Sequence, residues 1–189
     1  MSDFTIRPLA SSDIEQIKKL HATLVPVNYP PSFFLHLLIQ NSYSCLIALE
    51  PSSGEPVAWV SASVQKSSNL IGSLEPHIQL LTLGVLPEYQ HRGLAKRLVW
   101  EVVASLHKDP STPVPTVYTH VCTSNTPAQG FYESIGMRFL PAPNSPSGKP
   151  YVAKNVYTYP PLWAQKSAVG NNKLFESKDA YVLVGKITA

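Results

Sequence analysis

The stretch from residue 78 to residue 106 places the strongest constraint on what this chain can fold into. Residues 78–86 are apolar on both faces at all but two positions, which is typical of a strand buried in the middle of a sheet. The pattern Gln90-x-x-Gly93-x-Ala95 follows, and apolar side chains then recur at helical spacing up to position 106. These features predict a central strand, a short loop and a long amphipathic helix that covers the sheet.

The start of that helix is a predicted anion site. About four backbone N–H groups at a helix start have no partner within the helix, and the positive end of the helix dipole lies beside them. Gly93 has no Cβ, so a phosphate group can approach the backbone closely. Taken alone, the pattern fits a plain strand–turn–helix connection equally well, with Gly93 serving only the tight turn. Both interpretations are open at this point.

The remaining periodicities predict further elements on both sides of this junction. Ser12 followed by Glu15 indicates a capping box, Thr126 indicates a second N-cap, and Gly136 indicates a helix end. We expect helices at 13–24, 31–40, 94–106 and 127–135, and strands at 5–9, 45–49, 56–65, 78–86, 116–122, 153–159 and 180–187.

This order of elements predicts one fold class. It is α/β (α+β), with a mixed central sheet of about seven strands flanked by about four helices. The length of 189 residues suits a single domain over 1–189, and we expect an inserted loop near 141–178 because that stretch is proline-rich and poorly periodic.

Composition argues against several classes of partner. Fifteen Lys and Arg against twelve Asp and Glu give a net charge of +3, and the basic residues are scattered, unlike those of a nucleic-acid surface. Cys45 and Cys122 cannot form a disulfide framework and have no metal-ligand spacing. No apolar run reaches the roughly 20 residues that span a bilayer, and the first residues lack a signal-peptide pattern. We expect a monomer in the cytoplasm, with the nucleus left open, and no metal, nucleic-acid or membrane partner.

A second motif follows the first in the same order as in a known superfamily. Tyr118-x-His120-Val121 ends a predicted strand, and the chain continues with Ser124-Asn125, Ala128, Phe131-Tyr132 and Gly136-Met137. Together with the Gln-x-x-Gly-x-Ala pattern, this block resembles the GNAT superfamily of N-acetyltransferases. The resemblance implies the GNAT fold, in which the strands at 78–86 and 116–122 splay apart, and acetyl-CoA as the co-substrate.

The resemblance also implies which residues hold acetyl-CoA. The strand before the loop would bind the cofactor arm, the loop and helix start would bind its pyrophosphate, and two residues of the second motif would face its thiol end. In order, these residues are Leu83, Gly84 and Val85; Gln90, His91, Arg92, Gly93, Leu94, Ala95 and Lys96; and Asn125 and Tyr132. The Tyr132 hydroxyl would protonate the departing thiolate, and the alternative for Tyr132 is a core aromatic on a helix face.

The segment between the first two predicted helices is similar to a substrate loop. Residues 24–34 resemble the Phe-Pro-Val-x-Tyr segment of the San-type N-alpha-acetyltransferases (N-alpha-acetyltransferase 50, the NatE catalytic subunit), with the 60-type enzymes as the nearest confusable family. This implies acetylation of polypeptide amino termini that begin with Met and an apolar residue. The implied substrate-binding residues are Val25, Pro26, Val27, Tyr29, Phe33, Leu81, Tyr157 and Tyr159.

The implied catalytic base is His120, whose ordinary pKa suits removal of a proton from an α-amino group with a pKa of about 8. The family usually pairs this histidine with a tyrosine at the position of Gln79. Glutamine cannot act as a base, although it can position a water. We therefore expect His120 to suffice, a nearby tyrosine to substitute, or the turnover to be slow.

Two other functions remain open from the sequence. One is a GNAT enzyme that acts on lysine or small amines. The other is a catalytically weak accessory subunit that docks on the NatA complex at the ribosome, which Gln79 favours and the intact pattern from Gln90 to Ala95 disfavours.

Overall fold

The computed structural model of the chain describes residues 4–25, 27, 29–66, 75–109, 111–143, 145, 147–157 and 172–187. Its centre is one mixed sheet with the strand order β1-β2-β3-β4-β5-β8-β6, and β7 pairs with β8 beside this path. All neighbours are antiparallel except β4 and β5. The strands are β1 (Thr5–Pro8), β2 (Tyr43–Leu49), β3 (Pro56–Gln65), β4 (His77–Val85), β5 (Thr116–Cys122), β6 (Arg138–Phe139), β7 (Val152–Ala153) and β8 (Ala180–Lys186).

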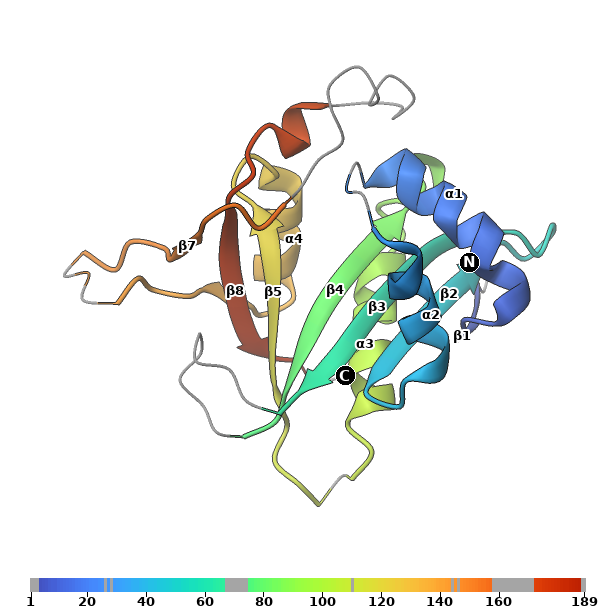
Figure 1. Cartoon of the computed structure of the whole chain (residues 1–189), viewed down its shortest axis with the longest axis horizontal. Coiled ribbons are helices and arrows are strands. Elements are labelled where there is room, and N and C mark those ends of the chain that lie inside the picture. Colours follow the sequence, from blue (N-terminus) through green and yellow to red (C-terminus); the bar gives the residue numbers. More distant parts are fainter. Residues whose placement is uncertain are drawn as a thin grey trace.

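Helices cover both faces of the sheet, as Figure 1 shows. One face carries α1 (Ile14–Leu24) and α2 (Pro31–Ile39), and the other carries α3 (Leu94–Leu106) and α4 (Thr126–Ser134). Short 3-10 turns are η1 (Ser11–Asp13), η2 (Pro87–Tyr89) and η3 (Asn172–Phe175). None of the described helices has both the length and the apolar character that a membrane span requires.

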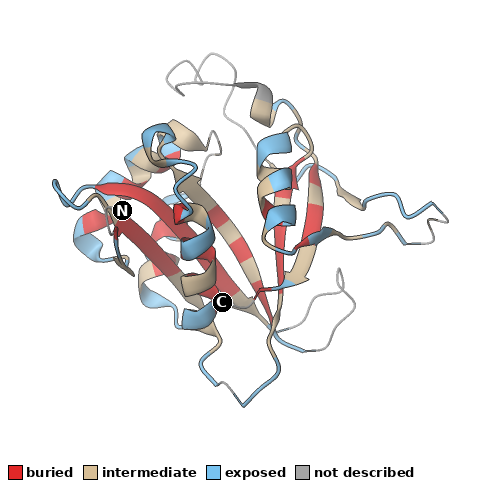
Figure 2. Ribbon diagram, turned by 180° about the vertical axis from the view of Figure 1, so that it is seen from behind, coloured by how far each residue is buried: buried red, intermediate tan, exposed pale blue. Residues whose placement is uncertain are grey.

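Each face of the sheet has its own core. Figure 2 shows that buried residues run along the central strands. The core under α3 and α4 is aliphatic and is built around Leu98, Val99 and Val102. The core under α1 and α2 is smaller and more aromatic, with Trp59 and Phe34 at its centre. The sheet therefore separates an aliphatic compartment from an aromatic one.

The central strands β4 and β5 part midway along their length. Their parallel pairing ends at Leu80 and Thr119, although both strands continue beyond these residues. The β3–β4 register shifts at the same level, between Ser61 and Ala62, so that Leu81 is an extra residue on β4. A bulge of this kind bends the strand that carries it. The predicted splay between these strands is confirmed, and Figure 1 shows the gap.

Several predicted boundaries need correction. The capping box of Ser12 and Glu15 is wrong, because η1 precedes α1 and it is the Asp13 carboxylate that accepts the Ala10 N–H, at 2.8 Å. The N-cap of α4 is Asn125, one residue before the predicted Thr126, and its side chain accepts the Ala128 N–H.

Within the described part of the strand predicted at 153–159, only Ala153 lies in a strand, Val152–Ala153, because residues 154–157 form a turn and an irregular stretch. Residues 158 and 159 lie outside the described residues. The two-residue strand β6 was not predicted. Its apolar signal is too short to stand out from the helix end before it.

Candidate active site

The loop between β4 and α3 has an unusual backbone. Its two residues with left-handed conformation are His91, with φ of 58°, and Gly93, with φ of 76°. Successive N–H groups in such a loop converge on one point and form a concave anion site. The first helical bond of α3 runs from the Arg97 N–H to the Gly93 carbonyl, so the N–H groups before Arg97 have no acceptor within the helix. The backbone therefore has the geometry that the predicted anion site requires.

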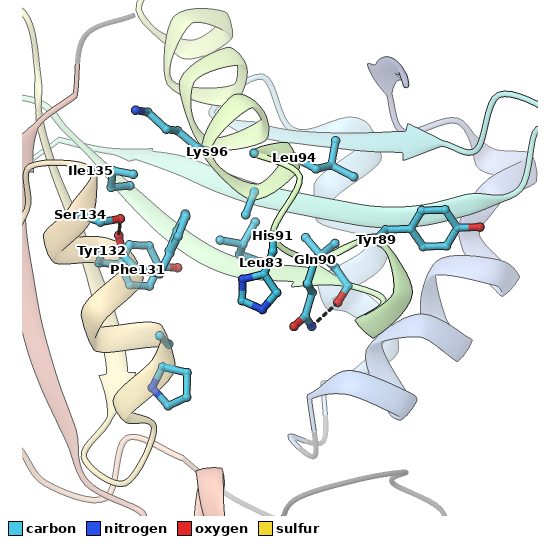
Figure 3. Close-up of a pocket in the computed structure, with 16 residues that line it drawn as sticks. Leu83, Tyr89, Gln90, His91, Leu94, Lys96, Phe131, Tyr132, Ser134 and Ile135 are labelled. Carbon is cyan, nitrogen blue, oxygen red and sulfur yellow. Dashed lines mark hydrogen bonds between the residues drawn. The ribbon is translucent and has the colours of Figure 1, made fainter. Parts of the chain in front are cut away.

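This loop opens on a cavity of about 570 Å³ between α3 and α4. Figure 3 shows Phe131 and Ile135 on α4 across the cavity from His91 and Lys96. The Gln90 side chain lies back along the strand and donates to the Val85 carbonyl at 2.9 Å. The lining includes nearly all of the predicted cofactor residues, namely Leu83, Gly84, Val85, Gln90, His91, Gly93, Leu94, Ala95, Lys96 and Tyr132.

Gly84 has a second reason to be glycine. A Cβ at this position would overlap the six-membered ring of Trp59, which is fully buried on the neighbouring strand. Because Trp59 belongs to the aromatic core and Gly84 lines the cofactor cavity, this close approach joins the two compartments. Steric fit to Trp59 therefore requires glycine at position 84, whatever the residue contributes to the cavity.

A second, smaller cavity of about 90 Å³ lies where β4 and β5 part. It shares Leu83, Ala128 and Tyr132 with the larger cavity, so the two meet at the Tyr132 side chain. This volume is several times what a single water needs. The described residues that line it are Val25, Tyr29, Leu81, Thr82, Leu83, Thr119, His120, Val121, Cys122, Asn125, Ala128, Tyr132, Tyr157 and Phe175.

Two titratable side chains flank this junction from opposite faces of the sheet. His120 lies on the same face of β5 as Tyr118, whereas the adjacent Thr119 lies on the opposite face and lines the small cavity together with Tyr132. Burial lowers the pKa of His120 below 6.5, which keeps the imidazole neutral near pH 7. Burial raises the pKa of Tyr132 to about 12, which keeps its proton on the hydroxyl. A neutral base and a hydrogen-bond donor therefore face the same small space.

The described residues contain no cluster of three or more His, Cys, Asp or Glu side chains placed to hold a metal. Residues 14–137 match the family model described as the acetyltransferase (GNAT) family. The chain belongs to the GNAT acetyltransferase family. It is accordingly an acetyltransferase that uses acetyl-CoA, and the larger cavity fits this co-substrate, with a backbone anion site at one end and Tyr132 at the junction with the smaller cavity.

Relatives of this GNAT chain carry more specific names. N-alpha-acetyltransferase 60 of Xenopus tropicalis is 25% identical over 173 residues, covering 84% of this chain and 69% of that protein. N-alpha-acetyltransferase 50 of Danio rerio is 26% identical over 128 residues, covering 68% and 70% respectively. The crystal structure of Arabidopsis thaliana NAA60 in complex with a bisubstrate analogue matches with a TM-score of 0.72, at 27% identity over 98% of both chains.

The GNAT site departs from the expected catalytic pair at Gln79. Gln79 is absent from the lining of both cavities, so its predicted place among the catalytic residues is not supported by contact with the site. Its Oε1 accepts the Tyr118 hydroxyl at 3.1 Å, and the Tyr118 ring meets the His120 ring edge to face, with centroids 6.0 Å apart. Sequence reasoning missed Tyr118 as the partner of Gln79, because the β4–β5 register is needed to pair them.

The predicted substrate residues divide into those that reach the small cavity and those behind it. Val25, Tyr29, Leu81 and Tyr157 line it, and the Tyr157 hydroxyl donates to the His120 carbonyl at 2.8 Å. Pro26 and Tyr159 lie outside the described residues.

Val27 and Phe33 were also predicted to bind the substrate, but neither lines the cavity. The Phe33 ring instead stacks on Tyr29 from behind, with ring centroids 4.5 Å apart. Phe33 therefore supports a lining residue and does not itself form the wall.

Two predicted cofactor residues also need revision. Arg92 does not line the large cavity, because its guanidinium donates to the Glu88 carbonyl at 2.9 Å and lies over the Tyr89 ring. Asn125 lines the small cavity and not the large one, and its side chain caps α4.

Lining residues that the sequence had not singled out as site residues include Tyr89, Phe131 and Ile135 in the large cavity and Thr119, Cys122 and Phe175 in the small one. Phe131 and Ile135 lie four residues apart in the helix predicted at 127–135, so helical spacing puts them on one face and a signal for them existed. Phe175 had none, because it lies in the poorly periodic insertion.

Proposed function

We propose that this acetyltransferase moves the acetyl group to the α-amino group of polypeptides that begin with Met followed by an apolar residue. The observation that carries the proposal is the small cavity beside His120. It has apolar or aromatic side chains on several sides, among them Val25, Tyr29 and Leu81. A methionine side chain suits such a space, because it is long, flexible and apolar.

His120 accepts the proton that the amine loses. An α-amino group has a pKa of about 8, so part of it is already neutral near pH 7 and its nitrogen can attack the acetyl carbon. As the new C–N bond forms, the nitrogen sheds a proton to His120 directly or through a water. The lowered pKa of His120 keeps it in the neutral form that this step requires.

Tyr132 stabilises the sulfur that leaves. Acetyl-CoA supplies an acetyl group activated as a thioester. A thiol has a pKa of about 8.5, well below the value of about 12 for Tyr132, so full proton transfer from Tyr132 is uphill. The phenol therefore acts as a hydrogen-bond donor to the sulfur as the C–S bond breaks. The proton held by His120 then reaches the thiolate through water, which balances the reaction.

The lining of the small cavity argues against polyamines as the preferred acceptor. None of its described lining residues is Asp or Glu, whereas a polyamine has a second cationic group that needs an acidic partner. An internal lysine has no such second group, so for lysine the peptide assay below decides. Docking on the NatA complex or the ribosome, and the cytoplasmic or nuclear location, stay predictions from the sequence.

Peptide acetylation assays test the proposal. Purified protein is given acetyl-CoA with a Met-Leu peptide, a Met-Val peptide, an amino-terminally blocked peptide with an internal lysine, and spermidine. We expect kcat/KM for the Met peptides to exceed that for the blocked lysine peptide by about 100-fold or more, since a side-chain pocket and a matched base each contribute. Faster transfer to lysine or spermidine would reject the proposal.

A further inference from the structure

One lining residue of the small cavity comes from a part of the chain with no predicted role. Phe175 ends the 3-10 turn η3, beyond the carboxyl end of β5 in Figure 1, and its half-buried side chain lines the cavity together with Tyr29 and Leu81. The other lining residues come from the α1–α2 connection, from β4, from β5 and α4 with their connection, and from Tyr157. Phe175 therefore brings an aromatic wall from a separate segment.

A single hydroxyl fixes the backbone on both sides of Phe175. Ser124 Oγ donates to the Leu174 carbonyl at 3.0 Å and accepts the Glu176 N–H at 3.1 Å and the Ser177 N–H at 3.4 Å. Cys122 Sγ donates to the Ser177 carbonyl at 3.0 Å. Because Ser124 and Cys122 lie at the end of β5, Phe175 is held in a fixed position relative to His120.

The residues that follow η3 strengthen this attachment. The Thr123 N–H donates to the Asp179 carbonyl at 3.0 Å, and the Asp179 carboxylate accepts Lys154 Nζ at 2.8 Å and the Asn155 N–H at 3.1 Å. The chain then enters β8, which pairs with β5 along its whole length. The turn is thus part of the same scaffold that carries the base.

We propose that Phe175 is a specificity-determining residue that recognises the first side chain of the acceptor polypeptide. The inference rests on the proposed function. An aromatic ring is a favourable partner for the thioether of methionine, and its area contributes most when the substrate side chain is long. Short first residues such as alanine do not fill the cavity and gain little from this wall.

The test compares Phe175→Ala with Leu174→Ala on a Met-Leu peptide and an Ala-Leu peptide. Leu174 is the matched control, because it lies half-buried in the same turn but does not line the cavity. Loss of one pocket contact of this size costs roughly tenfold in kcat/KM. We expect Phe175→Ala to lose about tenfold on Met-Leu, mainly through KM, and less than about twofold on Ala-Leu. Leu174→Ala should affect both peptides equally, and acetyl-CoA should bind with unchanged Kd throughout.

A second pair of variants separates recognition from folding. Ser124→Ala removes the hydroxyl that anchors the turn and should reproduce part of the Met-selective loss, whereas Ser124→Thr keeps a hydroxyl and should restore selectivity. Phe175→Ala with an unchanged Met-to-Ala ratio would overturn the role of Phe175, whether both rates fall or neither does. A wild type that binds acetyl-CoA but acetylates no peptide amino terminus would overturn the proposed function, and this inference with it.

Discussion

The cofactor half and the acceptor half of the site are built differently. The cofactor half is mostly one continuous stretch, residues 83–96, and its key groups are the backbone N–H groups at the start of α3. The acceptor half gathers side chains from five separate segments, with Val25 and Phe175 at its extremes in the sequence. The first half follows from local conformation, whereas the second requires the whole sheet to be in register. The two halves meet at Tyr132. Measuring acetyl-CoA binding and peptide acetylation separately therefore shows which half a variant disables.

The largest separation is expected from His120→Ala. His120 lines the small cavity only, and loss of a general base typically lowers kcat by about 10²–10⁴. Since the α3 loop is untouched, we expect the Kd for acetyl-CoA, measured by calorimetry, to stay within about twofold of wild type. A kcat that falls by less than about fivefold would remove His120 from the chemistry.

Gly84→Ala should impair the cofactor half and the acceptor half together. The added Cβ overlaps the Trp59 ring, and Trp59 cannot yield easily because His21 packs against it with ring centroids 4.2 Å apart. Overpacking of this kind costs about 1–3 kcal/mol of unfolding free energy. We expect urea unfolding to show this decrease in unfolding free energy, and both acetyl-CoA and peptide to bind more weakly.

Two further variants test whether the Trp59 ring is the cause. Gly130→Ala is the control, because Gly130 lies in α4 with no atom near an added Cβ and should be neutral or stabilising by about 0.5–1 kcal/mol. Adding Trp59→Phe to Gly84→Ala should recover part of the loss. If the double variant loses more unfolding free energy than Gly84→Ala and Trp59→Phe lose together, the clash is not the cause.

The same contrast explains how much the sequence could predict. The strand, loop and helix from 78 to 106 were predicted correctly to within a residue. Hydrophobic periodicity and the Gln90–Ala95 pattern depend only on residues close together in the sequence. The acceptor residues were predicted by resemblance, and two described ones were misplaced: Phe33 packs behind Tyr29, and Val27 does not line the cavity. Position along a loop does not reveal which side chains point inward, since tertiary packing decides it.

The missed residues have the same explanation. Pairing Tyr118 with Gln79 needs the β4–β5 register, and placing Phe175 in the cavity that His120 lines needs the bonds from Ser124 to η3. Both relations join residues far apart in the sequence, where hydrophobic period carries no information.

His21 provides a test confined to the aromatic core on the acceptor side. Its ring is 3% exposed, packs against Tyr29, Phe34 and Trp59, and neither ring nitrogen has a hydrogen-bond partner among the described residues. Burial lowers the pKa of His21 from 6.5 to about 3. The unfolded chain therefore binds a proton below pH 6.5 that the folded chain does not, so stability falls as the pH falls from 6.5 toward 3.

We expect His21→Leu to remove this pH dependence. The unfolding free energy of the wild type should be about 2 kcal/mol lower at pH 5 than at pH 7, and that of the variant should not show this decrease. Urea unfolding at both pH values measures the difference, with His36→Leu on α2 as the control. Equal acid sensitivity in wild type and His21→Leu would show that other groups cause the loss.

The smallest expected effect concerns the Tyr118–Gln79 pair. Variants of this pair test whether it acts on His120. Tyr118→Phe removes the hydroxyl that donates to Gln79 but keeps the ring beside His120. One hydrogen bond is worth about 0.5–1.5 kcal/mol, so kcat should fall about two- to tenfold with the acetyl-CoA Kd unchanged. Gln79→Leu should cost a similar amount. If the two side chains act as one unit, the double variant should lose no more than either single one, because the same bond is broken each time. Additive losses would instead show that the two side chains affect kcat through independent contacts.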